Sequence, residues 1–296
     1  MGLQALDLSG RRYLGPTSMD HEVALIMCNQ GLVRPGTLVH DPFVGTGSIL
    51  QAAAHRGALT MGTDIDVRVL RDGKIDKASG QRVTVWSNFE DARLAKPLAL
   101  LHCDLAQMPL RKDLKGWAHA FVCDPPYGVR AGGRKSGGRK RDENGQAFAV
   151  PEHLRHNHVP STAFYPLSEC LADLLDLAAK SLVMQGRLVY FYPAPLEAEG
   201  EEGGAELPTH PCLQLLANSL QTLSGKWGRR LLTMRKVREW YPQARAEAAE
   251  RAGCRQAGAA SDAVRHLFNL PPGAEAAPEK DKEKHKYWET YRGKRT

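Results

Sequence analysis

The sequence predicts an α/β fold, with a mostly parallel, seven-stranded sheet covered by helices on both faces. Short apolar runs typical of strands alternate with helical patterns from about residue 20 to residue 240. The composition is that of a globular protein, because 42% of the 296 residues are hydrophobic and 25% are charged. These proportions exclude collagen, a fully disordered chain and a disulfide scaffold.

The strands and helices are expected at definite places along this stretch. The seven strands are expected at Thr37–His40, Leu59–Gly62, Ala99–His102, Ala118–Cys123, Arg187–Tyr192, Leu220–Ser224 and Arg230–Lys236. The helices are expected at Asp20–Gln30, Ser48–Arg56, Ile65–Lys77, Ser168–Ser181 and Cys212–Asn218. The helix at Ser168 has the clearest pattern, because a serine suits the N-cap and apolar residues then recur at helical spacing.

Segments outside this alternation are expected to be loops or a tail. Arg130–Gln146 is glycine-rich and basic, and Leu196–Thr209 is glycine-rich and acidic, so both are predicted to be surface loops. One domain is therefore expected at residues 12–245, followed by a low-complexity, charged tail at residues 246–296.

The spacing of the cysteines and the sequence at the N-terminus indicate which cellular compartment to expect. None of the six cysteines forms a C-x-x-C pair, so no metal site is predicted, and Cys103 and Cys123 are expected to be small buried residues. The chain start lacks a signal-peptide pattern, and no apolar run approaches the length of a membrane span. We therefore expect a soluble, cytoplasmic protein.

The net charge of +7 is concentrated in two basic clusters. Arg130–Arg141 and Lys226–Arg238 each contain six basic residues and no acidic ones. Basic clusters can contact the phosphates of a nucleic acid. For Arg130–Arg141, a solvated loop without a binding role is an equal alternative. For Lys226–Arg238, a purely structural role in a pair of strands is equally compatible with the sequence.

A glycine-containing loop follows the first expected strand. It reads Asp41-Pro42-Phe43-Val44-Gly45-Thr46-Gly47, and a helix is expected from Ser48. Glycines let a ligand approach the backbone closely, and the start of a helix presents free N–H groups. The pattern of a nucleotide P-loop is absent, and so is the full dinucleotide fingerprint.

Three aspartates at strand ends indicate which ligand the loop could hold. Asp41 at the loop would repel a phosphate and attract an ammonium group, while Asp64 stands where a carboxylate binds ribose in doubly wound folds. Asp104 ends the next strand and could accept from an adenine amine. An ammonium group, a ribose and an adenine together describe S-adenosylmethionine. Asp64 and Asp104 could each instead be caps, but the three together favour the cofactor.

The segment Asp124-Pro125-Pro126-Tyr127 follows the fourth expected strand. The two prolines end the strand and leave carbonyl oxygens free, and Asp124 adds a carboxylate acceptor. Tyr127 offers a flat face on which a base can stack. Two converging acceptors would fix an exocyclic amine for methyl transfer. The alternative is a structural turn with a core tyrosine.

Together these motifs resemble class I S-adenosylmethionine-dependent amino-methyltransferases, which have a Rossmann-like fold. More narrowly, residues 12–240 are similar to the eukaryotic tRNA (guanine-10, N2-)methyltransferase family. The segments that carry this resemblance are Gly15–Asp20, Asp41–Ser48, Gly62–Asp66, Asp124–Gly128, Gly186–Tyr190, His210–Leu213 and Arg229–Met234.

The resemblance implies roles for individual residues. Asp124 and the Pro125 carbonyl would hold guanine N2, Pro126 would complete the motif, and Tyr127 would stack on the base. S-adenosyl-L-methionine would be bound by Thr17, Ser18, Asp41, Phe43, Gly45, Gly47, Asp64 and Asp104.

The resemblance also implies partners and leaves alternatives. The partners would be tRNA and a small zinc-binding activator subunit. Family members carry an N-terminal RNA-binding domain of the THUMP type, and the chain is expected to lack it. Two alternatives stay open: methylation of another base amine (adenine N6 or cytosine N4), and a truncated, non-catalytic fragment that binds the cofactor or the activator.

Overall fold

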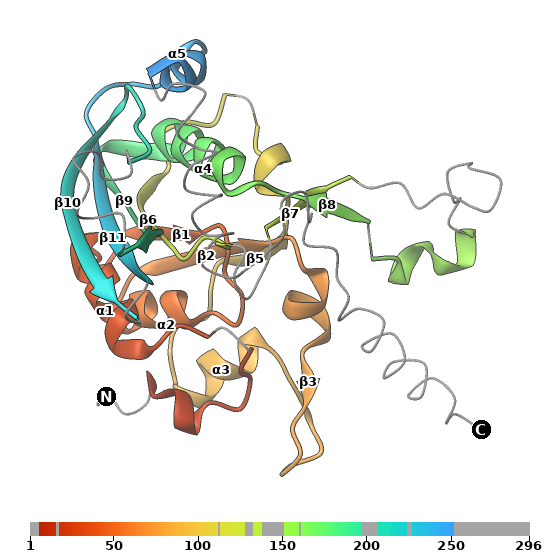
Figure 1. The fold of residues 1–296 in the computed structure, drawn as a ribbon. Coiled ribbons are helices and arrows are strands. Elements are labelled where there is room, and N and C mark those ends of the chain that lie inside the picture. The colour runs from red at the N-terminus through yellow and green to blue at the C-terminus, as the bar shows by residue number, and fades with distance from the viewer. Residues whose placement is uncertain are drawn as a thin grey trace.

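The computed structural model describes residues 6–15, 18–111, 113–127, 133–137, 151–159, 161–196, 207–223 and 227–251. These residues form a seven-stranded sheet in the order β10-β11-β9-β6-β1-β2-β5 (Figure 1). Its strands are β1 (Leu38–Asp41), β2 (Leu59–Asp64), β5 (Ala99–His102), β6 (Ala118–Cys123), β9 (Leu182–Pro195), β10 (Leu213–Thr222) and β11 (Trp227–Lys236). The first five of these pair in parallel, and β11 runs antiparallel to both of its neighbours.

The strand order contains a switch point beside β1. From β1 the chain proceeds outward through β2 to β5, and then crosses back to place β6 on the other side of β1. Ligands of open α/β sheets bind at the carboxyl ends of the strands that flank such a point. The predicted fold class is confirmed, and the carboxyl ends of β1 and β6 become the place to look for a site.

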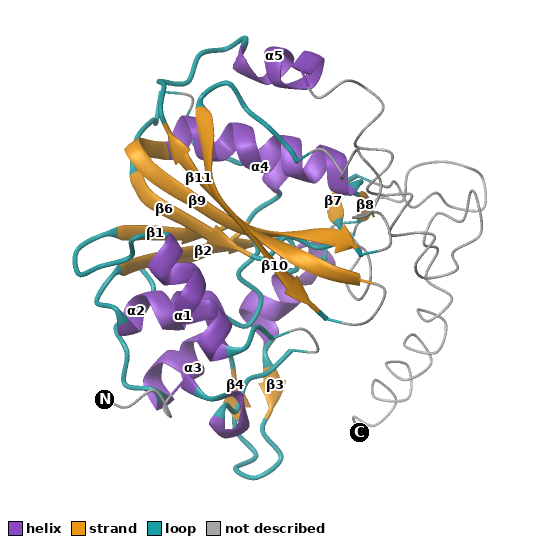
Figure 2. Cartoon of the chain, turned by 60° about the vertical axis from the view of Figure 1, so that its left-hand side comes forward, coloured by secondary structure: helices purple, strands orange, loops and turns teal. Residues whose placement is uncertain are grey.

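Helices cover both faces of the sheet (Figure 2). One face carries α1 (His21–Gln30), α2 (Ser48–His55) and α3 (Val85–Asp91). The other carries α4 (Leu167–Ser181), with α5 (Ala244–Arg251) packed against it. Short helical turns occur at Leu8–Gly10, Arg68–Asp72, Leu105–Gln107 and Glu152–Asn157.

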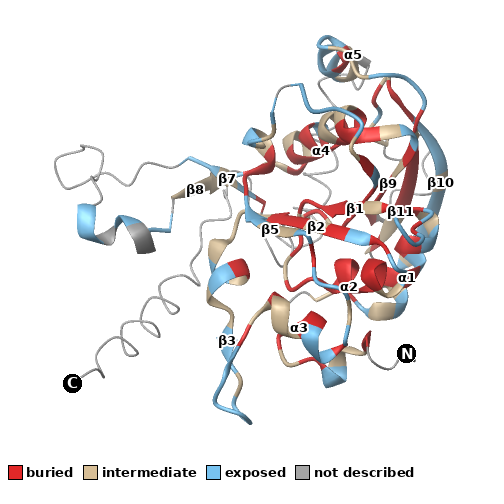
Figure 3. Ribbon diagram, turned by 180° about the vertical axis from the view of Figure 1, so that it is seen from behind, coloured by how far each residue is buried: buried red, intermediate tan, exposed pale blue. Residues whose placement is uncertain are grey.

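The hydrophobic core lies in two layers, one on each side of the sheet. Along β6, Phe121 and Cys123 belong to the α4-side layer, whereas Ala120 and Val122 belong to the α1-side layer. This alternation follows from the period of two in a strand, and both faces are apolar because both are covered. Buried residues accordingly gather on the central strands and the helix faces toward them (Figure 3).

The helix ends follow from local chemistry. The Asp20 carboxylate accepts from the N–H groups of Glu22 at 2.9 Å and Val23 at 3.4 Å, and so caps α1. The expectation that Ser168 is the N-cap is wrong: the α4 helix begins at Leu167, so Ser168 lies in its first turn, and the N-cap is Pro166 with φ −56°. Proline suits this position because its fixed φ is compatible with the start of a helix.

Two expected helices are wrong. In the expected helix Cys212–Asn218, Cys212 lies in a turn and Leu213–Asn218 form the start of β10, because pairing with β11 outweighs a helical pattern of apolar residues. Ile65–Lys77 contains one helical turn, Arg68–Asp72, which ends at Gly73 with φ +59°. The chain then forms a hairpin of β3 (Lys74–Ile75) and β4 (Arg82–Val83) that extends away from the sheet in Figure 1.

The remaining expectations concern loops, cysteines and termini. Within the expected basic loop, β7 (Arg134–Ser136) pairs with β8 (Thr162–Phe164), while the rest of that loop and residues 197–206 lie outside the described residues. Cys103 and Cys123 are buried, as predicted. Residues 252–296, most of the expected tail, are also outside the described residues. Across the described part of the chain, no helix combines the length and apolar character needed to cross a membrane.

Candidate active site

The two sequence motifs meet at the carboxyl ends of neighbouring strands. In the sheet, β1 and β6 pair with Val39 opposite Ala120 and His40 opposite Phe121. The next residues, Asp41 and the start of the Asp124 segment, therefore emerge at the same edge. The negative charge of Asp124 raises the pKa of Asp41, after the larger effect of burial.

The glycine loop is held close to β2 and α3. Gly47 precedes α2 with φ +86°, and a Cβ at this position would lie 2.8 Å from a methyl group of Val85. The N–H of Val44 donates to the carbonyl of Thr63 at 3.0 Å. The loop is thus fixed on the protein side, and the first turn of α2 is directed over it with no side-chain cap.

Asp41 is a buried carboxyl group with only 1% of its surface exposed. It accepts from the N–H of Phe43 at 3.0 Å and makes no ion pair with any described residue. Burial raises its pKa well above the ordinary value, and the charges of Asp64 and Asp124 raise it further. A cation at this edge would relieve that repulsion.

Asp64 ties β2 to the glycine loop. One carboxylate oxygen accepts from the N–H of Gly45 at 2.9 Å, and the other from the N–H of Asp66 at 2.8 Å. Each oxygen keeps a second lone pair, so a further donor such as a ribose hydroxyl can still be accepted. Ribose binding by Asp64 stays a prediction.

Asp104 makes the contacts of a cap. Its carboxylate accepts from the N–H of Ala106 at 2.9 Å, and from the N–H of Ser136 on β7 at 2.6 Å. The second bond ties the hairpin that follows the Asp124 segment back to the end of β5. Contact of Asp104 with adenine stays a prediction.

The other expected cofactor residues lie around the same loop. The Ser18 hydroxyl accepts from the N–H of Gly15 at 3.1 Å and lies 2.9 Å from the Thr46 hydroxyl. Phe43 is partly buried against the α4-side core. Thr17 lies outside the described residues. Ser18 therefore joins the segment before α1 to the loop.

Asp124 has a carboxylate oxygen that is available for a donor. Oδ1 is buried and accepts no hydrogen bond within the described residues. Oδ2 lies 3.6 Å from Nη1 of Arg229 on β11. Burial raises the pKa of Asp124 to about 7, and the positive charge of Arg229 opposes that rise. A buried acceptor without a donor is unusual in a folded protein and suits a binding position.

The residues after Asp124 shape the rim of this position. Pro125 is buried, and Pro126 and Tyr127 are partly buried. The Tyr127 ring packs against the α1-side core, and its hydroxyl is buried with no hydrogen-bond partner in the described part of the chain. Stacking of Tyr127 on a base therefore stays a prediction.

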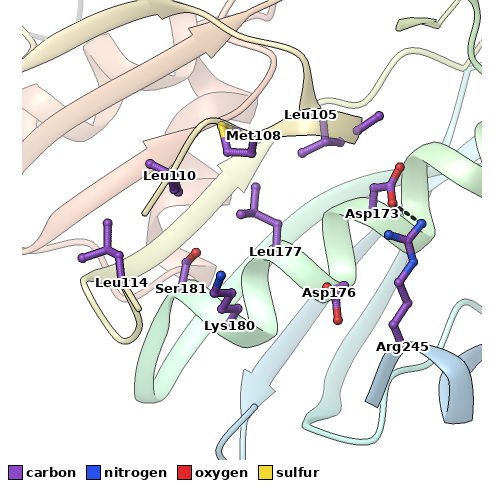
Figure 4. A pocket seen from close by; sticks show the side chains of 11 residues that line it. Leu105, Met108, Leu110, Leu114, Asp173, Asp176, Leu177, Lys180, Ser181 and Arg245 are labelled. Carbon is purple, nitrogen blue, oxygen red and sulfur yellow. Dashed lines mark ion pairs between the residues drawn. The ribbon is translucent and has the colours of Figure 1, made fainter. Parts of the chain in front are cut away.

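A pocket lies between α4 and the segment after β5 (Figure 4). Its lining includes Asp173, Asp176 and Arg245, together with leucines from α4 and from the segment after β5. These charged groups already have partners, since Asp173 pairs with Arg245 and Asp176 accepts from the Trp240 indole at 2.7 Å. Within the described residues, no cluster of three or more His, Cys, Asp or Glu is placed to hold a metal ion.

The known proteins to which this chain is similar include methyltransferases. Residues 9–150 match the family described as "RMKL-like, methyltransferase domain". Over 236 residues the chain is 43% identical to the tRNA (guanine(10)-N(2))-methyltransferase TRMT11 of Dictyostelium discoideum, covering 79% of this chain and 43% of that protein. TRMT11 of Homo sapiens is 37% identical over 244 residues, covering 80% of this chain and 51% of that protein.

Over 79–80% of its length the chain is similar to these curated tRNA (guanine(10)-N(2))-methyltransferases, and residues 9–150 match a methyltransferase domain. It spans about half the length of the curated relatives it matches. Among solved structures, TrmN from Thermus thermophilus is similar with a TM-score of 0.47 and 17% identity, over 79% of this chain and 52% of that one.

One residue at the site, Arg229, could not be identified from the sequence as a site residue. Arg229 entered only as part of the basic cluster Lys226–Arg238 and of a segment that resembles the family, and no local pattern marks it as a neighbour of Asp124. Its place follows from the pairing of β11 with β9, which brings the strand toward the end of β6.

Proposed function

We propose that this chain transfers a methyl group from S-adenosyl-L-methionine to the exocyclic N2 of a guanosine in tRNA, at position 10 as the names of its relatives state. The observation that carries this proposal is Oδ1 of Asp124, which is buried and has no hydrogen-bond partner among the described residues, at the sheet edge where Asp41 and the glycine loop also lie. Asp124 would accept a hydrogen of the amine there, and Asp41 and the glycine loop would hold the cofactor beside it.

The residues at this edge fit the charge of the cofactor. The charges of Asp64 and Asp124 raise the pKa of Asp41, and among the described residues Arg229 forms an ion pair with Asp124 only. The ammonium and sulfonium groups of S-adenosylmethionine would offset this excess of carboxylates. Asp41 would face the methionine part, Asp64 the ribose, and the first turn of α2 would lie over the loop. When bound, the cofactor supplies an electrophilic methyl group.

The protein's part in the reaction is to hold the amine. An exocyclic NH₂ donates one hydrogen to Asp124, and the ionised form of the carboxyl is the better acceptor. A fixed amine has its lone pair directed toward the cofactor position, which lowers the entropic part of the barrier. The prolines after Asp124 stiffen the chain at this point, because their φ angles are fixed.

Further parts of the proposal rest on the family resemblance. They are tRNA as the substrate, the small zinc-binding activator subunit as a partner, and the cytoplasm as the place of action. Arg134 on β7 is exposed, so it is available to contact a phosphate near the site.

Nucleoside mass spectrometry tests the proposed activity. The chain, with the activator subunit present, is incubated with labelled S-adenosylmethionine and a tRNA transcript, which is then digested. We expect N2-methylguanosine from the wild type and at least a hundredfold less from Asp124→Asn, which keeps the shape but not the charge. The control Asp113→Asn changes an exposed aspartate and should behave as the wild type. Methyladenosine or methylcytidine as the product would overturn the proposal.

A further inference from the structure

Arg229 reaches the site from the antiparallel end of the sheet. It lies on β11, where it stands opposite Pro193 of β9, and β9 pairs in turn with β6. Its Nη1 atom is 3.6 Å from Oδ2 of Asp124, which is too long for a hydrogen bond but close enough for a strong charge interaction. Arg229 is the cation that the described residues place beside this carboxylate.

The Arg229 guanidinium is held in place from three sides. Its Cζ lies 3.7 Å from the centre of the Phe191 ring, and its Nε donates to the side chain of Gln221 at 2.7 Å. Nη2 lies 3.8 Å from the sulfur of Met19. Stacking on a ring and a forked set of N–H donors suit arginine and not lysine.

Only 14% of the Arg229 side chain is exposed. Burial lowers the pKa of the guanidinium, and the charge of Asp124 opposes that change. A buried cation is unfavourable unless a charge partner compensates for lost hydration. Each of the two groups therefore favours the charged form of the other.

We propose that Arg229 is a positioning residue for Asp124, which keeps this carboxyl ionised and directed toward the amine of the acceptor base. This inference rests on the proposed function, because it concerns the same site. Nη1 makes no hydrogen bond in the described part of the chain, so the guanidinium acts on Asp124 by charge and leaves both carboxylate oxygens free to accept.

The charges around Asp124 decide the direction of the effect. Burial disfavours the ionised carboxylate of Asp124 and raises its pKa, whereas the charge of Arg229 favours the ionised form. With Arg229 present the pKa of Asp124 is about 7, so a large share of the group is ionised at neutral pH. Without the guanidinium the pKa of Asp124 must rise, and the first unit of that rise lowers the ionised fraction at pH 7 about fivefold.

The titration of Asp124 tests this inference without any methylation assay. The protein is labelled at the carboxyl carbon of its aspartates, and these signals are followed by NMR from about pH 5 to about pH 9, a range that contains the expected midpoint. The Asp124 signal is assigned by its loss in Asp124→Asn. We expect the midpoint to rise by about one unit or more in Arg229→Gln, and to return part of the way in Arg229→Lys, which restores a charge. An unchanged midpoint in Arg229→Gln would overturn the inference.

A matched control is available on the same strand. Arg235 also lies on β11 and donates to a glutamine of β10, Gln214, at 2.7 Å. Arg235→Gln should leave the Asp124 midpoint where it is, and thermal unfolding of each variant checks that the fold is kept. A shift as large in Arg235→Gln as in Arg229→Gln would mean that general loosening of the sheet, and not the Arg229 charge, moves Asp124.

Kinetics then separate this inference from the proposed function. If the wild type methylates tRNA, Arg229→Gln should lower kcat at pH 7 about fivefold or more with a smaller change in KM for tRNA, and the loss should shrink as the pH is raised. If kcat falls equally at every pH, Arg229 does not act through ionisation of Asp124. If the wild type is inactive while the midpoint shifts as expected, the proposed function fails and the role of Arg229 toward Asp124 stands.

Discussion

The carboxylate of Asp64 accepts a hydrogen bond from the backbone N–H of Gly45 at 2.9 Å, so the end of β2 fixes the loop that follows β1. The second carboxylate oxygen accepts from the N–H of Asp66. A residue expected to bind ribose is therefore also the support of the loop expected to bind methionine. Loss of its charge should affect both parts of the cofactor site.

Substitution Asp64→Asn tests this double role. We expect S-adenosylmethionine to bind at least tenfold more weakly, together with a loss of about 1–3 kcal/mol in the free energy of unfolding, because a buried acceptor is replaced by an amide. Calorimetric titration and denaturant unfolding measure the two effects. Asp66→Asn is the control, since Asp66 pairs with Arg68 nearer the surface, and it should change cofactor affinity less. Unchanged affinity in Asp64→Asn would remove Asp64 from the site.

Substitution Gly47→Ala tests the close approach of the loop to α3. We expect a loss of about 1–3 kcal/mol in the free energy of unfolding from the positive φ and from the 2.8 Å contact that a Cβ would make with Val85. Gly36→Ala is a matched control, because Gly36 has φ +78° but a Cβ there meets nothing within 4 Å. An equal loss in both variants would show that strain in φ alone matters and that the approach to Val85 does not.

Substitution Asp104→Asn tests the tie between β5 and the β7–β8 hairpin. The bond from the Ser136 N–H becomes weaker without the charge, so hydrogen exchange at Ser136 should be faster by about tenfold. Exchange at the paired strand Thr162–Phe164 should rise with it, while β1 should be unaffected. No change at Ser136 would contradict the tie. A weaker affinity for S-adenosylmethionine in the same variant would support the predicted adenine contact.

The raised pKa of Asp124 predicts a pH dependence of stability. Its folded pKa of about 7 lies above the ordinary value of 3.8, so its protonated form favours the folded state at low pH. That contribution is lost as the pH rises from about 4 through 7. Asp124→Asn should therefore be more stable than the wild type at pH 8, by about 1–3 kcal/mol, and not at pH 4. Equal unfolding curves at pH 8 would contradict the burial of an ionised Asp124.

Much of this arrangement follows from local patterns in the sequence. The aspartates at the strand ends could be predicted, because an apolar run that is followed by an acidic residue and glycines is typical of a strand that ends at a ligand-binding loop. In the structure, Asp41 and Asp124 do stand at the ends of neighbouring strands. The helix expected at Cys212–Asn218 failed because the decisive term is pairing with β11, which is not local. The Arg229–Asp124 pair was out of reach for the same reason, since it depends on the order of strands in the sheet.

The hydrogen bonds that Asp104 accepts illustrate a different limit of prediction from sequence. Its bond to Ala106, two residues away, is of a kind that sequence can suggest, whereas its bond to Ser136 requires a hairpin inside a segment that composition describes only as a basic loop. Both interpretations of Asp104 were reasonable from its position, and only the hairpin shows that one oxygen serves the fold.

The central claim is that the chain methylates the exocyclic N2 amine of a guanosine in tRNA. Its most direct test is methyl transfer to two tRNAs that differ only in the presence of that amine. One transcript has guanosine at position 10, and the other has inosine there, which lacks the exocyclic N2 amine. With S-adenosylmethionine and the activator subunit present, the account predicts methylation of the first and none of the second. Equal methylation of both transcripts, or methylation of neither while the cofactor is bound, would contradict it.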